Sequence, residues 1–225
     1  MNKRIIVLLL AVLCGVTQLY AERRVSVGVK GGLLSRSYTL DQKSIVFSDA
    51  KGNEYSKYDN FSYESKYGFE AGLMLRVRLW KSANEATGAS VHLQLDGIYG
   101  QNNLVLRGSN EGDDIDVLTS KITTRTVDVP LLVCLKASVV RLSAGAVFHA
   151  YSKYDLRSGN ASGFEGIMPL CGYALGIGFD FGKVTLDGRY CGEIKPGRWN
   201  ILNNAYSTTL TGRRASWSIC LGVAF

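Results

Sequence analysis

Hydrophobic and polar residues alternate along most of the chain beyond residue 22, which is the pattern typical of β-strands. The clearest stretch is 67–79, where the odd positions are all apolar and the even positions are mostly small or charged. The same period of two recurs in seven other segments: 25–30, 91–96, 127–136, 140–149, 172–181, 184–190 and 216–225. Because residues two apart in a strand lie on the same face, the pattern predicts about eight strands, each with one apolar face.

Long and short connections alternate between these segments. Polar stretches follow the first, third, fifth and seventh strands, at 37–66, 107–120, 152–169 and 194–214. The other connections are short, at 81–90, 137–138 and 182–183. All long loops therefore gather at one end of the sheet, as in bacterial outer-membrane barrels, and each strand is near the ~9–11 residues that a tilted crossing of a bilayer needs.

The polarity of the two strand faces distinguishes a membrane barrel from a soluble, lipocalin-like one. A soluble barrel buries its apolar face inside, but eight strands enclose too little volume for all the large apolar side chains found here. Aromatic residues near the strand ends fit the interfacial girdles of membrane barrels: Tyr67, Phe69, Tyr99, Phe148, Tyr151, Tyr173, Phe181, Tyr190, Trp217 and Phe225. The sequence therefore predicts an all-β protein, an eight-stranded antiparallel up-and-down transmembrane β-barrel.

The N-terminal segment has the features of a secretory signal peptide. Lys3 and Arg4 precede the apolar run 5–16, and Ala21 supplies a small residue for cleavage. The run is shorter than the roughly 18 residues of a spanning helix. Cys14 follows Leu13, whereas a lipoprotein signal requires a small residue there, so we expect no lipid anchor. The predicted domains are a cleaved signal peptide, 1–21, and an outer-membrane barrel, 22–225.

Charge and the C-terminus refine the prediction. The formal net charge is +7, but the basic residues are spread along the chain rather than gathered in the stripe that nucleic-acid binding requires. The chain ends on an aromatic residue after alternating hydrophobic positions, which resembles the signal that the barrel assembly machinery recognises. Its members are Trp217, Ile219, Leu221, Val223 and Phe225. We expect outer-membrane localisation, assembly machinery as a partner and no nucleic acid.

Charged residues on the polar face are expected to point into the lumen. By parity they are Lys30, Glu70, Arg76, Arg78, Asp96, Asp128, Lys136, Arg141, Asp180, Asp187, Arg189 and Glu193. Buried charges must be paired or hydrated, and this mixture of signs can interlock as a polar plug. A narrow porin-like channel for small solutes is the alternative.

Four segments resemble the PorT-like outer-membrane β-barrel family of Bacteroidota. They are 27–33, 69–73, 186–190 and, most specifically, 127–136 with its motif Val129, Pro130, Leu131 and Leu132. The resemblance implies a β-barrel fold and an outer-membrane location. It also implies an accessory role in a secretion system. Proline removes a ladder donor, so Pro130 predicts a bulge or a locally unpaired position.

The sequence offers little catalytic chemistry. Beside His149 lie Ser143 and Ser152, which leaves a lumen or rim enzyme acting on lipid as an unfavoured alternative; His92 lies near the other end of the barrel. No spacing of Cys or His indicates a metal site, and no cofactor is predicted. A bridge between Cys191 and Cys220 on neighbouring strands is one option, and free buried thiols are the other.

The loops are the expected place of function. The first contains the aromatic residues Phe47, Tyr55, Tyr58, Phe61 and Tyr63, which are typical of binding surfaces. The second is acidic through Glu111, Asp113, Asp114 and Asp116, and the last is basic through Lys195, Arg198, Arg213 and Arg214. Outer-membrane lipid and lipopolysaccharide are therefore expected partners, with secretion-system components as the family resemblance implies. The favoured function is a non-enzymatic structural or interaction barrel.

Overall fold

The computed structural model describes residues 24–41, 45–48, 54–58, 60–83, 89–109, 118–159, 163–167, 169–203 and 206–225. The predicted signal peptide, 1–21, lies outside these residues. Within them the regular structure is β-strand. No helix in the described part of the chain is long and apolar enough to cross a membrane.

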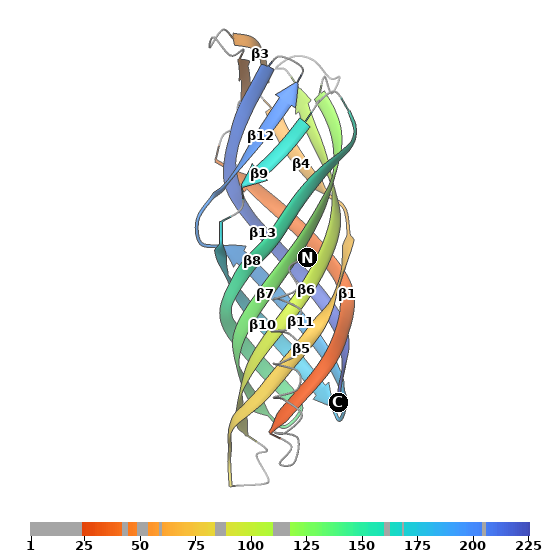
Figure 1. The fold of residues 1–225 in the computed structure, drawn as a ribbon, viewed down its shortest axis with the longest axis vertical. Helices are drawn as coiled ribbons and strands as arrows, with labels where there is room; N and C mark the ends of the chain where they lie inside the picture. The colour runs from red at the N-terminus through yellow and green to blue at the C-terminus, as the bar shows by residue number, and fades with distance from the viewer. Residues whose placement is uncertain are drawn as a thin grey trace, which may run out of the picture.

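Eight long strands form a closed antiparallel barrel (Figure 1). The chain runs around the wall in the order β1-β5-β6-β7-β8-β10-β11-β13, and β13 pairs with β1 to close it. Their bounds are Val25–Leu40, Gly68–Lys81, Ser90–Ser109, Leu118–Ala137, Val140–Gly159, Cys171–Phe181, Val184–Glu193 and Tyr206–Ala224. The predicted eight-stranded up-and-down barrel is confirmed, and an even strand number leaves Val25 and Phe225 at the same end.

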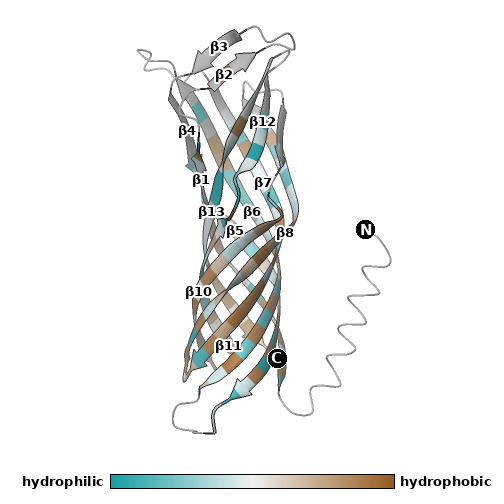
Figure 2. Cartoon of the chain, turned by 90° about the vertical axis from the view of Figure 1, so that its left-hand side faces the viewer, coloured by the Kyte–Doolittle hydropathy of each residue, from teal (hydrophilic) through white to brown (hydrophobic). Residues whose placement is uncertain are grey.

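The lower section of the barrel has an apolar outer wall (Figure 2). Leu33 of β1 and its neighbour Ile219 of β13 each expose 64% of their surface, whereas Lys30 and Met74, of opposite parity, are buried. Apolar side chains are similarly exposed on every strand of the wall. Monomeric soluble proteins rarely expose so large a continuous apolar surface, and a transmembrane barrel requires one.

Tight turns close this lower end. Gly182 begins the turn between β10 and β11 with a φ of 63°, a left-handed conformation that costs glycine nothing. Ser138 has a φ of 54° in the turn between β7 and β8. This turn contains Ser138 and Val139 rather than the predicted 137–138, because Ala137 still pairs with Val140.

The long loops are shorter than the polar pattern indicates, and this part of the prediction is wrong. β1 continues to Leu40, β6 to Ser109 and β8 to Gly159, while β7 begins at Leu118 and β13 at Tyr206. The added segments are rich in Thr, Ser and Tyr, residues that favour strands but do not give a strong hydrophobic alternation. Their polarity therefore resembled that of loops.

Five short strands complete an upper section. β4 (Asn60–Ser65) pairs with β6 above the end of β5, and β12 (Gly197–Asn203) pairs with the upper part of β13. β9 (Gly163–Ile167) pairs with β12, and β2 (Ile45–Ser48) pairs with β3 (Glu54–Tyr58) at the top (Figure 2). The wall thus continues beyond the apolar band.

The two sections have opposite polarity inside. In the upper section Leu104, Ile122, Trp199 and Leu210 are almost completely buried, while the outward side chains include Thr39, Lys121, Lys153 and Arg213. An apolar core with a polar surface is the arrangement of a water-soluble barrel. The lower section instead surrounds a charged lumen.

Pro130 lies at a gap in the ladder between β6 and β7. Leu95 pairs with Leu131 and Ile98 with Asp128, but the positions between them on each strand are not paired. Proline has no N–H to donate across that gap. On its other side Pro130 stays in register with Val147, and a bulge follows between Val127 and Asp128.

Candidate functional site

The lumen of the lower section holds two connected groups of ion pairs. In the first, Asp180 of β10 lies 3.2 Å from Arg76 Nη1 and 3.1 Å from Lys136 Nζ, and it also contacts Arg141. Arg141, with 2% of its side chain exposed, contacts Asp187 of β11 as well. These five residues are named the lower charge layer.

The middle charge layer surrounds Asp96 of β6, whose side chain is fully buried. Asp96 Oδ2 lies 2.5 Å from Lys30 Nζ and 2.6 Å from Arg189 Nη2, and Gln94 Nε2 donates to Asp96 at 3.0 Å. Gln94 Oε1 accepts a bond from Arg76 Nε at 3.1 Å, which joins this layer to the lower one. Charged side chains from β1, β5, β6, β7, β8, β10 and β11 therefore form ion pairs across the lumen.

An upper charge layer lies where the two sections meet. His149 Nδ1 is 2.6 Å from Asp128 Oδ1, and Arg214 Nη2 lies 3.4 Å from His149 Nε2. The same Arg214 nitrogen lies 2.9 Å from His149 Nδ1, so the imidazole ring is held between a carboxylate and a guanidinium group. Arg214 Nε lies 3.3 Å from Glu193 Oε1, and its backbone amide donates to Glu193 Oε2 at 3.0 Å.

Arg36 of β1 extends this layer to the opposite wall. Its Nη2 donates to Thr126 Oγ1 at 2.6 Å, and Thr126 in turn donates to Asp128 Oδ2 at 3.3 Å. Arg36 and Arg214 are both buried. Two guanidinium groups are thus balanced by the carboxylates of Asp128 and Glu193.

Aromatic residues cover the upper charge layer. The ring of Tyr38 packs edge-on against Trp199 with centroids 5.5 Å apart, and Trp199 Nε1 donates to Tyr154 OH at 3.2 Å. Burial raises the pKa of both phenols, Tyr38 and Tyr154, which stay neutral. Gly166 of β9 has no room for a Cβ, which would lie 2.5 Å from the Tyr154 ring and 2.7 Å from Trp199.

The cavity between the middle and upper layers is small. Its volume is about 20 Å³, which is room for about one water molecule. Its lining includes Arg36, Glu70, Asp128, Arg189 and Cys191. The described side chains therefore fill the lumen at this level rather than enclose a pathway for solutes.

The predicted lumen charges take different positions. Buried ones are Lys30, Glu70, Arg76, Asp96, Arg141, Asp180, Asp187, Arg189 and Glu193. The side chains of Asp128 and Lys136 remain 20% and 26% exposed. Arg78 is half-buried beside a bulge between Arg78 and Trp80 at the lower end of β5.

Two members of the upper charge layer were missed by the sequence analysis. Arg214 was assigned to a basic loop, but it lies in β13 and points into the lumen. Continuing the alternation of Trp217 and Ile219 upstream would have placed Arg214 on the inward parity. The same extension from Lys30 along β1 identifies Arg36.

The cysteines do not form the bridge that was one option. All four described cysteines, Cys134, Cys171, Cys191 and Cys220, are free. Cys191 pairs with Ser216 and Asp187 with Cys220, so the two candidates are four residues out of register. Cys220 Sγ instead donates to Glu70 Oε1 at 2.8 Å.

Among the described residues, neither histidine contacts both a serine and a carboxylate, as a catalytic triad requires. His149 bonds Asp128 and Arg214 among the described residues, whereas Ser143 lies opposite Cys134 and Ser152 opposite Thr126. His92 bonds Ser90 at 2.8 Å near the lower end of β6. In the described segments, no group of three or more His, Cys, Asp or Glu residues is placed to hold a metal ion.

Other predicted residues lie on the wall or outside the description. Trp217, Ile219, Leu221 and Phe225 of the C-terminal pattern are exposed on the apolar band, with Val223 between Val29 and Val184. Of the family motif, Leu131 is exposed and Leu132 buried. The acidic residues 111–116 lie outside the described residues. The aromatic residues of the first loop belong to β2, β3 and β4, and only the backbone of these aromatic residues is described.

Comparison with known proteins gives no family assignment. No protein-family model matches the sequence, and no curated protein matches it. Among solved structures, the chain is similar to the outer membrane protein OprG from Pseudomonas aeruginosa, at 12% identity and a TM-score of 0.48, over 89% of this chain and 95% of that one.

Two other solved structures are similar to a comparable extent. Ail, the attachment invasion locus protein of Yersinia pestis, has 13% identity and a TM-score of 0.39, over 89% of this chain and 98% of that one. The outer membrane protease OmpT from Escherichia coli has 11% identity and a TM-score of 0.44, over 90% and 97%. At such values the likenesses carry no argument about activity, ligand or partner, and the fold rests on this chain's own strand pairing.

Proposed function

We propose that this chain is an exported, non-enzymatic barrel of the bacterial outer membrane that acts as a structural or interaction protein. The observation that carries the proposal is the filled lumen: three layers of paired polar side chains lie below an apolar core. A barrel filled in this way has no evident route for solutes. Its upper section is a wall of hydrogen-bonded strands that can present a surface beyond the membrane.

The orientation follows from the same features. The apolar band spans the bilayer and the upper section faces outward. The short turns lie in the periplasm, as do the start of β1 at Val25 and the residue after β13, Phe225. Export through the signal peptide ending at Ala21 and recognition of the C-terminal pattern by the barrel assembly machinery complete this proposal.

The lumen is expected to be electrically silent. The full mature chain, inserted into planar lipid bilayers, should give no conductance steps above the leak of the lipid, because charged side chains join across the lumen and the cavity between the middle and upper layers holds about 20 Å³. Insertion is verified separately by the shift in gel mobility between heated and unheated samples. Discrete, reproducible conductance steps from inserted protein would establish the narrow-channel alternative instead.

A finer proposal is an accessory role in protein secretion. It is supported by the resemblance of segment 127–136 to the PorT-like family and by the structured upper section. Deleting the gene should move secreted and surface proteins from the culture medium into the periplasm, as measured by quantitative proteomics of the two fractions. A complementing copy with Lys136→Ala, a change confined to the lumen, should restore secretion, and unchanged secretion after deletion rejects this role.

A further inference from the structure

We infer that the face formed by β1, β13, β11 and β10 binds a phosphorylated acyl lipid of the outer leaflet, the lipid A portion of lipopolysaccharide. The inference rests on the proposed outer-membrane location. It is carried by an apolar groove on the wall and by three cations directly beyond it that have no ion-pair partner among the described residues.

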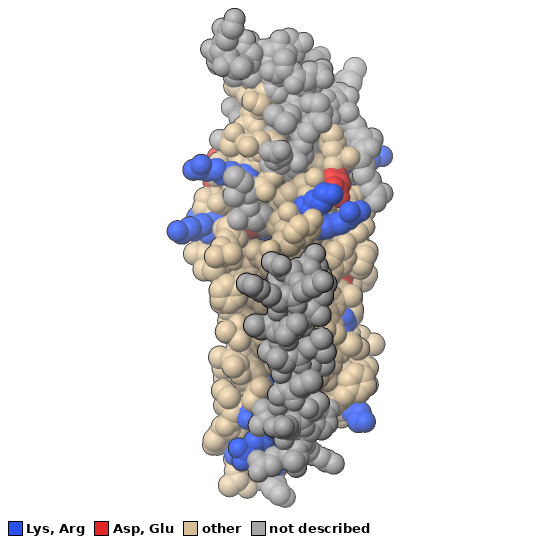
Figure 3. Space-filling view, viewed as in Figure 1, with Lys and Arg blue, Asp and Glu red and all other residues tan. Residues whose placement is uncertain are grey.

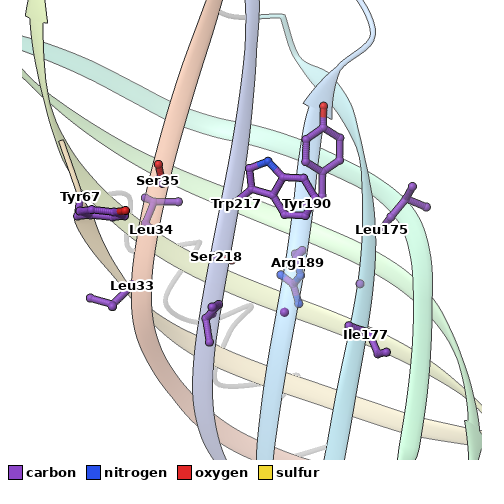
Figure 4. Close-up of a pocket in the computed structure, with 13 residues that line it drawn as sticks. Leu33, Leu34, Ser35, Tyr67, Leu175, Ile177, Arg189, Tyr190, Trp217 and Ser218 are labelled. Carbon is purple, nitrogen blue, oxygen red and sulfur yellow. The ribbon is translucent and has the colours of Figure 1, made fainter. Parts of the chain in front are cut away.

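The groove follows from one glycine on the lipid-facing side. Gly188 of β11 points outward and is in register with Ile177 of β10 and Ile219 of β13. A Cβ at Gly188 would have only Ile177 within 4 Å, so its surroundings are open. Ile177 and Leu175 lie on one side of the groove and Leu33 on the other (Figure 4). Ile219, the cross-strand neighbour of Gly188 on β13, also lines it. The hollow suits an extended acyl chain.

Aromatic rings mark the upper end of the groove. Tyr190 and Trp217 are cross-strand neighbours with ring centroids 4.6 Å apart, and both line the groove (Figure 4). Tyr and Trp concentrate where the hydrocarbon of a membrane meets its polar headgroups. The headgroup of a lipid in the groove would therefore lie just beyond these rings.

Three exposed cations lie at that level. Arg213 lies two outward positions above Trp217 on β13. Lys195 lies in the link between β11 and β12, and Arg198 lies near the start of β12. Arg198 pairs with Thr211, which makes it a diagonal neighbour of Arg213 on the outward face. Among the described residues, none of the three has an ion-pair partner. The backbone amide of Asp41 donates to Thr211 O beside this face.

Several other cations of the same belt have a carboxylate partner. On the opposite wall Arg125 and Lys153 pair with Asp155 at 3.1 and 3.0 Å, and Arg107 pairs with Glu64 at 3.1 Å. On the face seen in Figure 3, which lies opposite the groove, Lys and Arg side chains are found above a largely uncharged band and again at its lower end. Lys195, Arg198 and Arg213 have no such carboxylate partner among the described residues, and phosphate groups of a lipid would complement them.

The test measures lipid binding to the full mature chain in detergent. The probes are bisphosphorylated lipid A, the same lipid without phosphates, and the phosphorylated headgroup without acyl chains. Replacing Lys195, Arg198 and Arg213 with Gln should weaken binding of lipid A on the order of 100-fold, at about fivefold per cation. The matched control replaces Lys121, Arg125 and Lys153 with Gln and should change binding less than about threefold.

The remaining arms separate the two parts of the site. Gly188→Leu, which fills the groove, should weaken lipid A binding but leave binding of the acyl-free headgroup unchanged. Loss of phosphates should reproduce the effect of the triple change. Equal losses in both triple variants, or equal binding of lipid A and of its headgroup, would overturn the inference. Failure of the unmodified chain to insert into vesicles would instead reject the proposed function itself, and with it this site.

Discussion

Replacing Arg141 with alanine is expected to lower the free energy of unfolding of the barrel by about 3–5 kcal/mol. Arg141 lies between two carboxylates, Asp180 and Asp187, and only 2% of its side chain is exposed. Without Arg141, the buried carboxylate of Asp187 loses its ion-pair partner, and the lumen is too crowded to hydrate that carboxylate. Denaturant titration of the chain folded into lipid vesicles measures the change.

Lys136 provides the matched control for this prediction. It pairs with the same carboxylate, Asp180, but 26% of its side chain is exposed. Lys136→Ala should therefore cost less than about 1 kcal/mol, because solvent can replace the lost interaction. Equal and small effects of the two changes would show that the lumen is hydrated rather than filled, and would weaken the argument for a closed barrel.

Trp199→Ala is expected to destabilise the upper section by about 3–5 kcal/mol, the usual cost of removing a large buried aromatic side chain. Among the described residues Trp199 is the largest fully buried side chain. It packs on Tyr38, and its indole N–H bonds Tyr154. The change should speed amide hydrogen exchange in β9 and β12, while the strands of the lower section keep their protection.

Trp217 separates this effect from a general loss of tryptophan. Its ring is 63% exposed on the apolar wall, so Trp217→Ala should leave exchange in β9 and β12 unaltered. Slower folding or uniform exchange across the whole barrel in Trp199→Ala would mean that the two sections unfold as one unit. The expected result is that the upper section opens on its own.

The sequence predicted most reliably where apolar and polar residues alternate strictly, because this alternation assigns each side chain to one of the two faces of its strand. The alternation in 67–79 and 216–225 placed Leu73 and Ile219 on the wall and Arg76 and Cys220 inside, and the structure has them there. The strands within the polar stretches 107–120, 152–169 and 194–214 could not be predicted from the alternation. In a wall that faces water on its outside, Thr and Ser on the outer face remove the contrast that marks a strand.

The site was only partly predictable for a related reason. Parity identifies which charges point inward, but it gives neither their partners nor their height in the barrel. The pairing of Lys30 with Asp96, 66 residues apart, depends on strand register and tilt. The bridge considered between Cys191 and Cys220 failed on the same point, since a shift of four residues along β13 separates them.

The sequence by itself determined the period of two, the number of strands in the wall and the side of each strand that carries charge, because these depend only on the alternation of residues along one strand. Only the tertiary structure decided the closure of β1 on β13, the union of Arg36, Asp128, His149 and Arg214 in one layer, and the apolar core around Trp199. Those features arise between strands that are distant in the chain, where register, tilt and packing volume govern which side chains meet.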